Sequence, residues 1–334
     1  MDPATHALTS FALARGFFPR RRWPIVLGII FAGTIADLDW FSAWDGPAAY
    51  FAAHRTFTHS LLGTIAVIAA ALFFTHYIAK KHEPEPILAL LLPLTIAAAL
   101  HPALDLLQSE GVLFLWPFSA KRYAADCLPS IDLWILALLI AGILVPELFR
   151  LVTSEIGVKD KRPRGRNGAL VALALIAACI GARAILHANS AASLDPHSYK
   201  GESARTVAAY PDSLSLFTWH GVVETQSYLC QVAVPTGPGK AFDPESADCL
   251  HKPEPSPELD AAQKTKIAQA YVNAMPFPRA TVAKTPDGYE ILLRSMRDAA
   301  EKETRHRLAG RVIVDPRFTT SSEELIWLSD VTLR

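Results

Sequence analysis

The sequence predicts a membrane all-α bundle of five or six transmembrane helices, followed by a small α+β soluble domain. Only 19% of the 334 residues are charged and 51% are hydrophobic, whereas soluble domains average about 25% charged residues. Uncharged apolar runs recur through residues 1–187, and sequence of ordinary mixed polarity fills residues 188–334. We therefore expect a transmembrane domain over 1–187 and a soluble domain over 188–334. This composition argues against a fully soluble enzyme and against a disordered protein.

Apolar segments of helix length justify the predicted bundle. Crossing about 30 Å of hydrocarbon takes about 20 mainly apolar residues. The candidate spans are residues 23–36, 60–79, 87–107, 131–152 and 167–186, and the first eighteen residues are a weaker sixth candidate. Arg15 opposes the sixth span unless its side chain reaches the cytoplasmic interface.

Residues 188–334 show the patterns of strands, one helix and loops. Aromatic and β-branched residues predict paired strands over 214–234, and Pro286-Asp287-Gly288 predicts the turn of a hairpin over 280–297. Further strands are expected at 311–315 and 325–333, one amphipathic helix at 257–274 and a loop at 235–257. Cys230 and Cys249 are compatible with a disulfide and equally with two free thiols.

Basic residues indicate the orientation in the membrane, because Lys and Arg are enriched in cytoplasmic loops. They gather at residues 20–22, 80–81 and 150–166, whereas segments 37–59 and 108–130 hold three between them. We therefore predict a multi-pass protein of the inner (plasma) membrane with an extracytoplasmic C-terminal domain. The formal net charge is zero, so no nucleic-acid partner is expected.

Histidine and aspartate residues collect at the predicted outer ends of the helices. His101 and Asp105 are four residues apart and share one helix face, and Asp2 and His6 repeat this spacing. Singly, His101 could be a satisfied core histidine, and Asp132 could be a helix cap. Together they indicate a functional site, because ionisable residues at membrane depth are rare and usually functional. Six spans would bring His6 to the same side as the others.

Imidazole and carboxylate groups without thiolates suit zinc, manganese or iron, as one or two divalent ions. The candidate metal ligands are His6, Asp37, Asp39, His54, His59, His101 and Asp105. Arg55 and Asp39 are the candidate catalytic residues, Arg55 as the group that neutralises a phosphate or oxyanion. Arg55 is equally compatible with a role as a juxtamembrane anchor. A metal-activated water attacking an ester or phosphoester of an amphiphilic or lipid-linked substrate is the predicted chemistry.

Four motifs resemble the YdjM-like family of inner-membrane metal-dependent hydrolases. They are MDPATHAL at the start, AGTIADLDW at 32–40, HRTFTHSLLG at 54–63 and HPALDLLQSEGVLFLWPFSAKR at 101–122. The resemblance implies metal binding and hydrolysis at these residues, and it covers residues 1–150 best. This sequence departs from the family at Thr34-Ile35-Ala36, where a proline is expected directly before the first aspartate. It also has Leu133 where the family often has a proline.

The same histidine and aspartate residues are compatible with two alternatives to an enzyme. A metal or proton transporter needs polar residues through the depth of the membrane, whereas here they gather at one face. A non-catalytic scaffold would use the metal only to hold helices together. Membrane lipids are the expected partners in each case.

Overall fold

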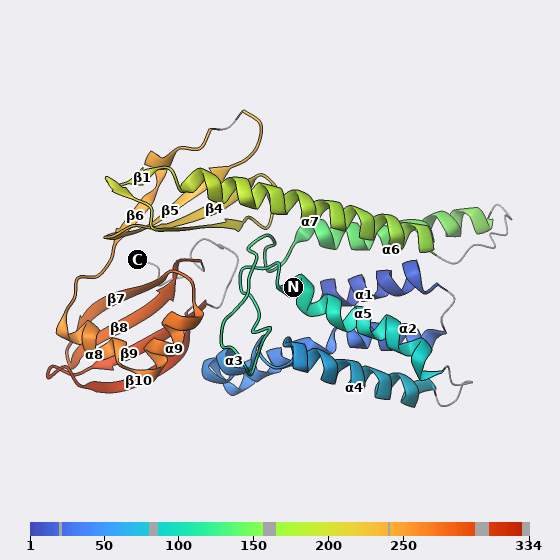
Figure 1. Ribbon diagram of the computed structural model, residues 1–334, viewed down its shortest axis with the longest axis horizontal. Coiled ribbons are helices and arrows are strands. Elements are labelled where there is room, and N and C mark those ends of the chain that lie inside the picture. The colour runs from blue at the N-terminus through green and yellow to red at the C-terminus, as the bar shows by residue number, and fades with distance from the viewer. Residues whose placement is uncertain (20–21, 80–85, 156–164, 240, 298–306, 329–334) are drawn as a thin grey trace. The chain divides into compact units, whose positions relative to one another are not determined.

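The computed structural model describes residues 1–19, 22–79, 86–155, 165–239, 241–297 and 307–328. The chain divides into two compact units. The membrane unit comprises residues 1–40 and 53–184, and the tail unit comprises residues 41–52 and 185–334. The sequence places the boundary at residue 187, whereas the contacts place it after Ala184 and assign segment 41–52 to the tail unit. Figure 1 shows helices in the first unit and mainly strands in the second.

The membrane unit is built from helices. They are α1 (Pro3–Phe17), α2 (Trp23–Ala32), the 3-10 helix η1 (Ile35–Asp45), α4 (Leu61–Ala79), α5 (Ile87–Asp105), α6 (Leu133–Glu155) and α7 (Arg166–Leu194), of which η1 and α7 end in segments assigned to the tail unit. Within the described residues, the four helices α4 to α7 are long and apolar enough to cross a membrane. A fifth span results if α2 and η1, bent by 50°, count as one broken span. The predicted fold class is confirmed.

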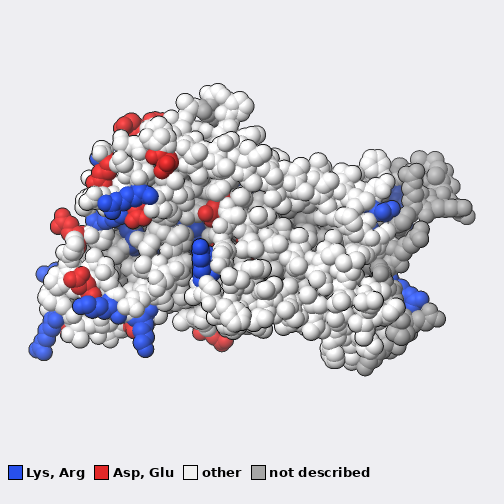
Figure 2. Space-filling model, in the orientation of Figure 1, with Lys and Arg blue, Asp and Glu red and all other residues white. Residues whose placement is uncertain are grey.

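Two apolar cores hold the bundle together. One joins residues of α1, α2, α4 and α5, and the other joins α1, α5, α6 and α7. Helix α1 contributes to both cores, although its fifteen residues span only about 22 Å at 1.5 Å per residue. Lys, Arg, Asp and Glu are sparse over α4, α5 and α6 on the face shown in Figure 2, as a surface in contact with lipid requires.

Charged residues inside the bundle are paired. Arg15 forms an ion pair with Glu147 of α6. This partner in another helix reduces the energetic cost of a charged side chain in the apolar helix α1. Arg183 of α7 is buried, and its Nε lies 3.0 Å from Asp132 Oδ2. The other Asp132 oxygen accepts hydrogen bonds from the backbone N–H groups of Trp134 and Ile135. Asp132 is therefore a helix cap as well as an ion-pair partner.

Several of the basic residues that indicate the orientation in the membrane lie outside the described residues. Arg20, Arg21, Lys80, Lys81 and the basic residues between 159 and 164 belong to the segments that the structure does not describe.

The tail unit contains two four-stranded antiparallel sheets. The first has the order β3-β4-β5-β6, formed by Thr206–Pro211, Thr218–Glu224, Tyr228–Pro235 and Asp248–His251. The second has the order β10-β9-β8-β7, formed by Thr320–Leu328, Arg307–Val314, Gly288–Ser295 and Pro278–Thr285. A short pair, β1 (Ser198–Tyr199) and β2 (Glu202–Ser203), completes the strands of the described residues.

Helices α8 (Pro257–Gln263) and α9 (Lys266–Ala274) pack on the second sheet. The short helix α3 (Pro47–Ala53) lies mostly in segment 41–52, where Tyr50 contacts Trp327 of β10.

Several predicted elements of the tail are confirmed, and two are corrected. The hairpin around Pro286-Asp287-Gly288 is β7–β8, and the strands over 214–234 are β4 and β5. The single helix predicted over 257–274 is wrong, because Thr265 adopts extended backbone and caps α9 by accepting from the Ala268 N–H. The loop predicted over 235–257 is also incomplete, because it contains β6. Of the strand predicted at 325–333, residues 329–333 lie outside the described residues.

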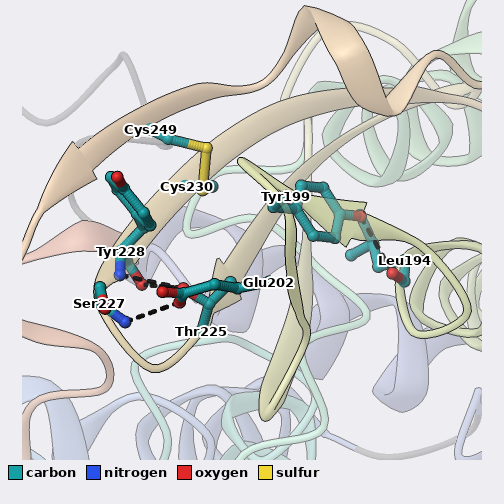
Figure 3. Close-up of a disulfide and its surroundings, with 8 residues drawn as sticks. All are labelled: Leu194, Tyr199, Glu202, Thr225, Ser227, Tyr228, Cys230 and Cys249. Atoms are coloured by element: carbon teal, nitrogen blue, oxygen red, sulfur yellow. Dashed lines mark hydrogen bonds between the residues drawn. A yellow bond between two sulfur atoms is a disulfide. The ribbon is translucent and has the colours of Figure 1, made fainter.

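The first sheet of the tail unit carries a disulfide between Cys230 of β5 and Cys249 of β6 (Figure 3). The two cysteines are direct cross-strand partners, so strand register brings together thiols that lie 19 residues apart. Beside it, the Glu202 carboxylate accepts a hydrogen bond of 2.8 Å from the Ser227 N–H. This bond, with Thr225 and the Ser227 side chain, lowers the pKa of Glu202 to about 2.

We expect Glu202→Gln to reduce the acid-dependent part of the tail unit's stability. A carboxylate whose folded pKa is lowered stabilises the fold above its unfolded pKa of 4.5, and the stabilisation disappears as the pH falls toward 2. The wild type should therefore unfold at a higher temperature than the variant at pH 6, and the gap should close between pH 4.5 and 2. Near-UV circular dichroism of the detergent-solubilised chain measures this. A gap that is the same at pH 6 and pH 3 would contradict it.

Candidate metal centre

Four buried or half-buried side chains from three helices converge at one end of the membrane unit. His6 of α1, Asp37 of η1, and His101 and Asp105 of α5 each offer one nitrogen or oxygen, and these atoms lie within 4.8 Å of one another. Four ligands of this kind could hold a metal ion. His101 and Asp105 share one face in the last turn of α5, as their spacing predicts.

His101 is held in one orientation by the backbone. Its Nδ1 lies 2.8 Å from the carbonyl oxygen of Gly33. A carbonyl can only accept, so Nδ1 carries the proton and Nε2 keeps its lone pair for the cluster. Gly33 is required at this point, because a Cβ there would lie 1.9 Å from Ser10 Oγ of α1. Close packing of α1 against the end of α2 thus helps to orient His101 of α5.

His59, in the loop before α4, reaches the same cluster. Its Nε2 lies 3.0 Å from His101 Nε2 and 3.0 Å from Asp105 Oδ2. Its Nδ1 lies 3.1 Å from Asp39 Oδ2, which fixes the proton on Nδ1 in the neutral ring. A carboxylate that orients a metal-binding histidine through its second nitrogen is a common arrangement in metal sites.

The facing atoms of the cluster are all acceptors. With both Nδ1 atoms protonated, the Nε2 lone pairs of His59 and His101 point at each other across 3.0 Å, beside a carboxylate oxygen. Asp37 Oδ2 and Asp105 Oδ2 are both buried, and neither has a hydrogen-bond donor among the described residues while His59 is neutral. This arrangement is repulsive unless a positive charge, either a proton on His59 or a bound cation, lies among the atoms. Ligands bound tetrahedrally at about 2.0–2.1 Å lie about 3.3 Å apart, and the distances between Nε2 and carboxylate oxygens here run from 3.0 to 3.9 Å. The residues present therefore fit a metal ion.

The two aspartates of the Asp37-Leu38-Asp39 motif face different partners. Residues 35–45 form the 3-10 helix η1. With three residues per turn, positions two apart point in different directions. Asp37 therefore faces His101, at 3.5 Å, whereas both oxygens of Asp39 face the loop before α4.

Asp39 binds the loop of residues 54–59 and orders it. Its Oδ1 lies 3.0 Å from His54 Nδ1, and its Oδ2 accepts from the Arg55 N–H at 2.9 Å and from Thr58 Oγ1 at 2.8 Å. Arg55 has a positive φ of 56°, a conformation uncommon for a residue with a side chain. The structure thus places Asp39 behind His59, as an orienting group, and not among the four converging ligands.

The histidines of this loop differ in their surroundings. Burial acts to lower the pKa of His59, but hydrogen bonds to Asp105 and Asp39 outweigh it and raise the pKa above its usual value. Burial lowers the pKa of His54, against the opposing effect of Asp39. His54 Nε2 lies 3.9 Å from Glu110 Oε2, and His54 is not among the four converging side chains. Of the predicted ligands, His54 and Asp39 therefore lie next to the four converging residues and outside them.

The Arg55 side chain lies beside the centre and is almost completely buried. Its Nη2 lies 2.6 Å from Gln108 Oε1 and 3.6 Å from Asp105 Oδ1, and its Nη1 lies 3.4 Å from Glu110 Oε2. A guanidinium with several donors in a buried site is suited to an anionic ligand. This geometry is compatible with the predicted position of Arg55 beside the candidate site.

Sequence reasoning missed Gln108. Its amide accepts from Arg55 through Oε1 and donates through Nε2 to the backbone oxygens of Pro129 and Ser130, each at 3.0 Å. Gln108 follows Asp105 by three residues, a spacing that could have indicated its position. The α-amino group of Met1 also contacts Asp105 and Gln108. Asp2, in contrast, caps α1 and accepts from the Thr5 N–H.

Comparisons with known proteins agree with the motifs. A family model described as YdjM inner membrane protein matches residues 1–190. No curated protein and no solved structure matches the chain.

Proposed function

Because the chain belongs to the YdjM inner membrane protein family, we propose that it is a membrane-embedded, metal-dependent hydrolase. The substrate is an ester or phosphoester of an amphiphilic or lipid-linked molecule. The observation that carries the proposal is the group of acceptor atoms on His59, His101 and Asp105, which face one another in a buried site beside Arg55.

The metal would be held by His6, His59, His101, Asp37 and Asp105. This set of nitrogen and oxygen donors favours zinc, with manganese or iron as alternatives. Since five donors exceed one tetrahedral shell, the set suits one ion of higher coordination or two ions. When bound, a divalent metal supplies Lewis acidity and a water nucleophile near neutral pH.

The surrounding residues prepare the site for hydrolysis. Arg55 binds the anionic group of the substrate and offsets the negative charge that develops as water adds to phosphorus or to a carbonyl carbon. The bond to the leaving alkoxide then breaks, the water's proton ends on the alcohol, and an acid and an alcohol are released. Asp39 orients His59 and His54, and Gln108 holds the guanidinium of Arg55.

Orientation in the membrane is part of the proposal. The site lies at the C-terminal end of α5 and in the loop before α4, which are the ends that the distribution of basic residues assigns to the outer face. A centre at that level receives an ester group directly from the outer leaflet, and the tail unit is then extracytoplasmic.

Turnover of defined esters by detergent-purified protein tests the hydrolase. We expect hydrolysis of a para-nitrophenyl phosphodiester with a hexadecyl chain, or of para-nitrophenyl palmitate, in the presence of bound metal. Arg55→Ala should keep the metal and lower kcat/KM by about 10²- to 10³-fold, as loss of one charge-stabilising donor does. Arg55→Lys should recover part of this loss.

Metal analysis of the same samples separates the alternatives. Protein that carries stoichiometric metal and hydrolyses neither ester would contradict the proposed hydrolase activity and favour the non-catalytic scaffold. Metal uptake by proteoliposomes would instead favour the transporter.

A further inference from the structure

Residues 113–122 form a closed loop that is part of the membrane unit. The base of the loop is fixed by Val112 and Tyr123, whose N–H groups each donate to the other's carbonyl oxygen at 3.0 and 2.9 Å. Inside the loop, the Phe118 N–H donates to Leu115 O at 2.9 Å. The excursion is therefore ordered by backbone hydrogen bonds and not by burial of its side chains.

The tip of this loop is apolar and exposed. The sequence Leu115-Trp116-Pro117-Phe118 leaves 40% of Leu115, 36% of Trp116 and 84% of Phe118 accessible. Nearby Phe57 is 45% exposed, and its ring centroid lies 5.7 Å from that of Trp116. Exposure of three adjacent large apolar side chains in water is unfavourable, and contiguous patches of this kind mark an interaction surface.

The apolar tip continues the lipid-facing surface of a membrane span. The N–H of Leu61, the first residue of α4, donates to Phe114 O at 2.9 Å. Leu61, Leu62 and Ile65 are exposed on α4, one of the helices long and apolar enough to cross a membrane. The loop therefore stands at the level where α4 enters the bilayer.

The same loop is tied to the candidate metal centre. The Leu113 N–H donates to Arg55 O at 3.0 Å, and Arg122 Nη2 lies 3.4 Å from His54 O. The loop thus contacts the two residues that begin the HRTFTH motif.

We propose that the tip of this loop, residues 115–118 with Phe57, inserts into the headgroup region of the bilayer beside the site. Tryptophan and phenylalanine favour this region, whereas a non-helical backbone exposed to hydrocarbon would leave polar groups unsatisfied. Lys121 and Arg122 follow the tip after two residues, so the partner that fits is a surface containing anionic phospholipids. Delivery of a lipid ester from this surface to Arg55 rests on the proposed function, and the insertion does not.

Fluorescence quenching in proteoliposomes tests the insertion. Phe118→Cys, in a Cys179→Ala background, is labelled with an environment-sensitive fluorophore, and Leu88→Cys, 80% exposed on α5, serves as a lipid-facing reference. A phosphatidylcholine spin-labelled near its headgroup should quench the label at 118 more strongly than one spin-labelled near the chain end. Emission at 118 that neither lipid quenches, while position 88 is quenched, would overturn the insertion.

The charge and delivery steps have separate readouts. Adding phosphatidylglycerol should increase quenching at position 118, and the double variant Lys121→Gln/Arg122→Gln should remove this increase. If phosphatidylglycerol changes quenching in neither protein, the preference for anionic lipid is contradicted.

Phe118→Ser should keep the metal content and lower turnover of the hexadecyl phosphodiester several-fold relative to turnover of the same phosphodiester with a methyl group in place of the hexadecyl chain. An equal effect on both substrates would contradict delivery of the lipid ester by the loop without contradicting insertion of the loop. If the wild type hydrolyses neither substrate, the result contradicts the proposed hydrolase activity and does not test the insertion.

Discussion

Purified Asp105→Asn protein is expected to bind a divalent metal at the proposed centre far more weakly than the wild type. Asp105 contacts His6, His59 and His101 at 3.0 to 3.5 Å and is completely buried, so it joins all three histidines of the cluster. Four-ligand zinc sites bind with about 10–16 kcal/mol, so one ligand is worth about 3 kcal/mol, or a hundredfold or more in Kd. Asparagine keeps the size of the side chain and removes the charge. Mass spectrometry of metal content measures the loss.

Matched variants show whether the loss is specific. Asp45→Asn removes an exposed carboxylate at the end of η1, the helix that carries Asp37 and Asp39, and should leave the metal content unchanged. Asp39→Asn should weaken binding by about 10- to 100-fold, the effect of removing an orienting partner. Wild-type protein purified without chelators that holds no stoichiometric divalent metal would contradict the assignment of this centre.

Arg183→Met is expected to destabilise the membrane unit by about 3–5 kcal/mol, the range for breaking a buried ion pair from one side. Both side chains of the pair with Asp132 are at most 1% exposed, and methionine fills much of the volume of arginine without its charge. The Asp132 carboxylate would then remain buried without its cation. The free energy of unfolding in mixed micelles, measured by titration with dodecyl sulfate, gives the difference.

The double variant Asp132→Asn/Arg183→Met separates charge from packing. Asparagine can still accept the hydrogen bonds at the start of α6, and no charge stays buried, so most of the lost stability should return. A double variant as unstable as Arg183→Met alone would show that lost packing of the arginine stem, and not the unpaired carboxylate, causes the effect.

Much of the fold could be predicted from the sequence because bilayers impose a simple length rule. Runs of about 20 apolar residues identify spanning helices, and four such helices are present among the described residues. The break between α8 and α9 could not be predicted in this way. Amphipathic spacing continues through Lys264 and Thr265, and only the cap formed by Thr265 with the Ala268 N–H divides it.

The candidate site was predicted in its residue types and only in part in its geometry. The spacing of His101 and Asp105 places both on one helix face, because successive turns of a helix align such residues. The different directions of Asp37 and Asp39 follow from η1 being a 3-10 helix, which no local pattern indicated. Gln108 was missed because its contacts, Arg55 and the Pro129 and Ser130 carbonyls, come from distant parts of the chain.

Composition and motifs are enough to identify a membrane protein of the YdjM family with histidines and aspartates at the ends of apolar helices, because hydrophobic length and residue type are local properties. Which of their atoms meet is a property of the packed helices. The packing brings His6, His59 and His101 around Asp105, and it sets Asp39 behind His59. Ligand distances of 3 to 4 Å depend on how four separate segments pack, and no spacing along one segment contains that information.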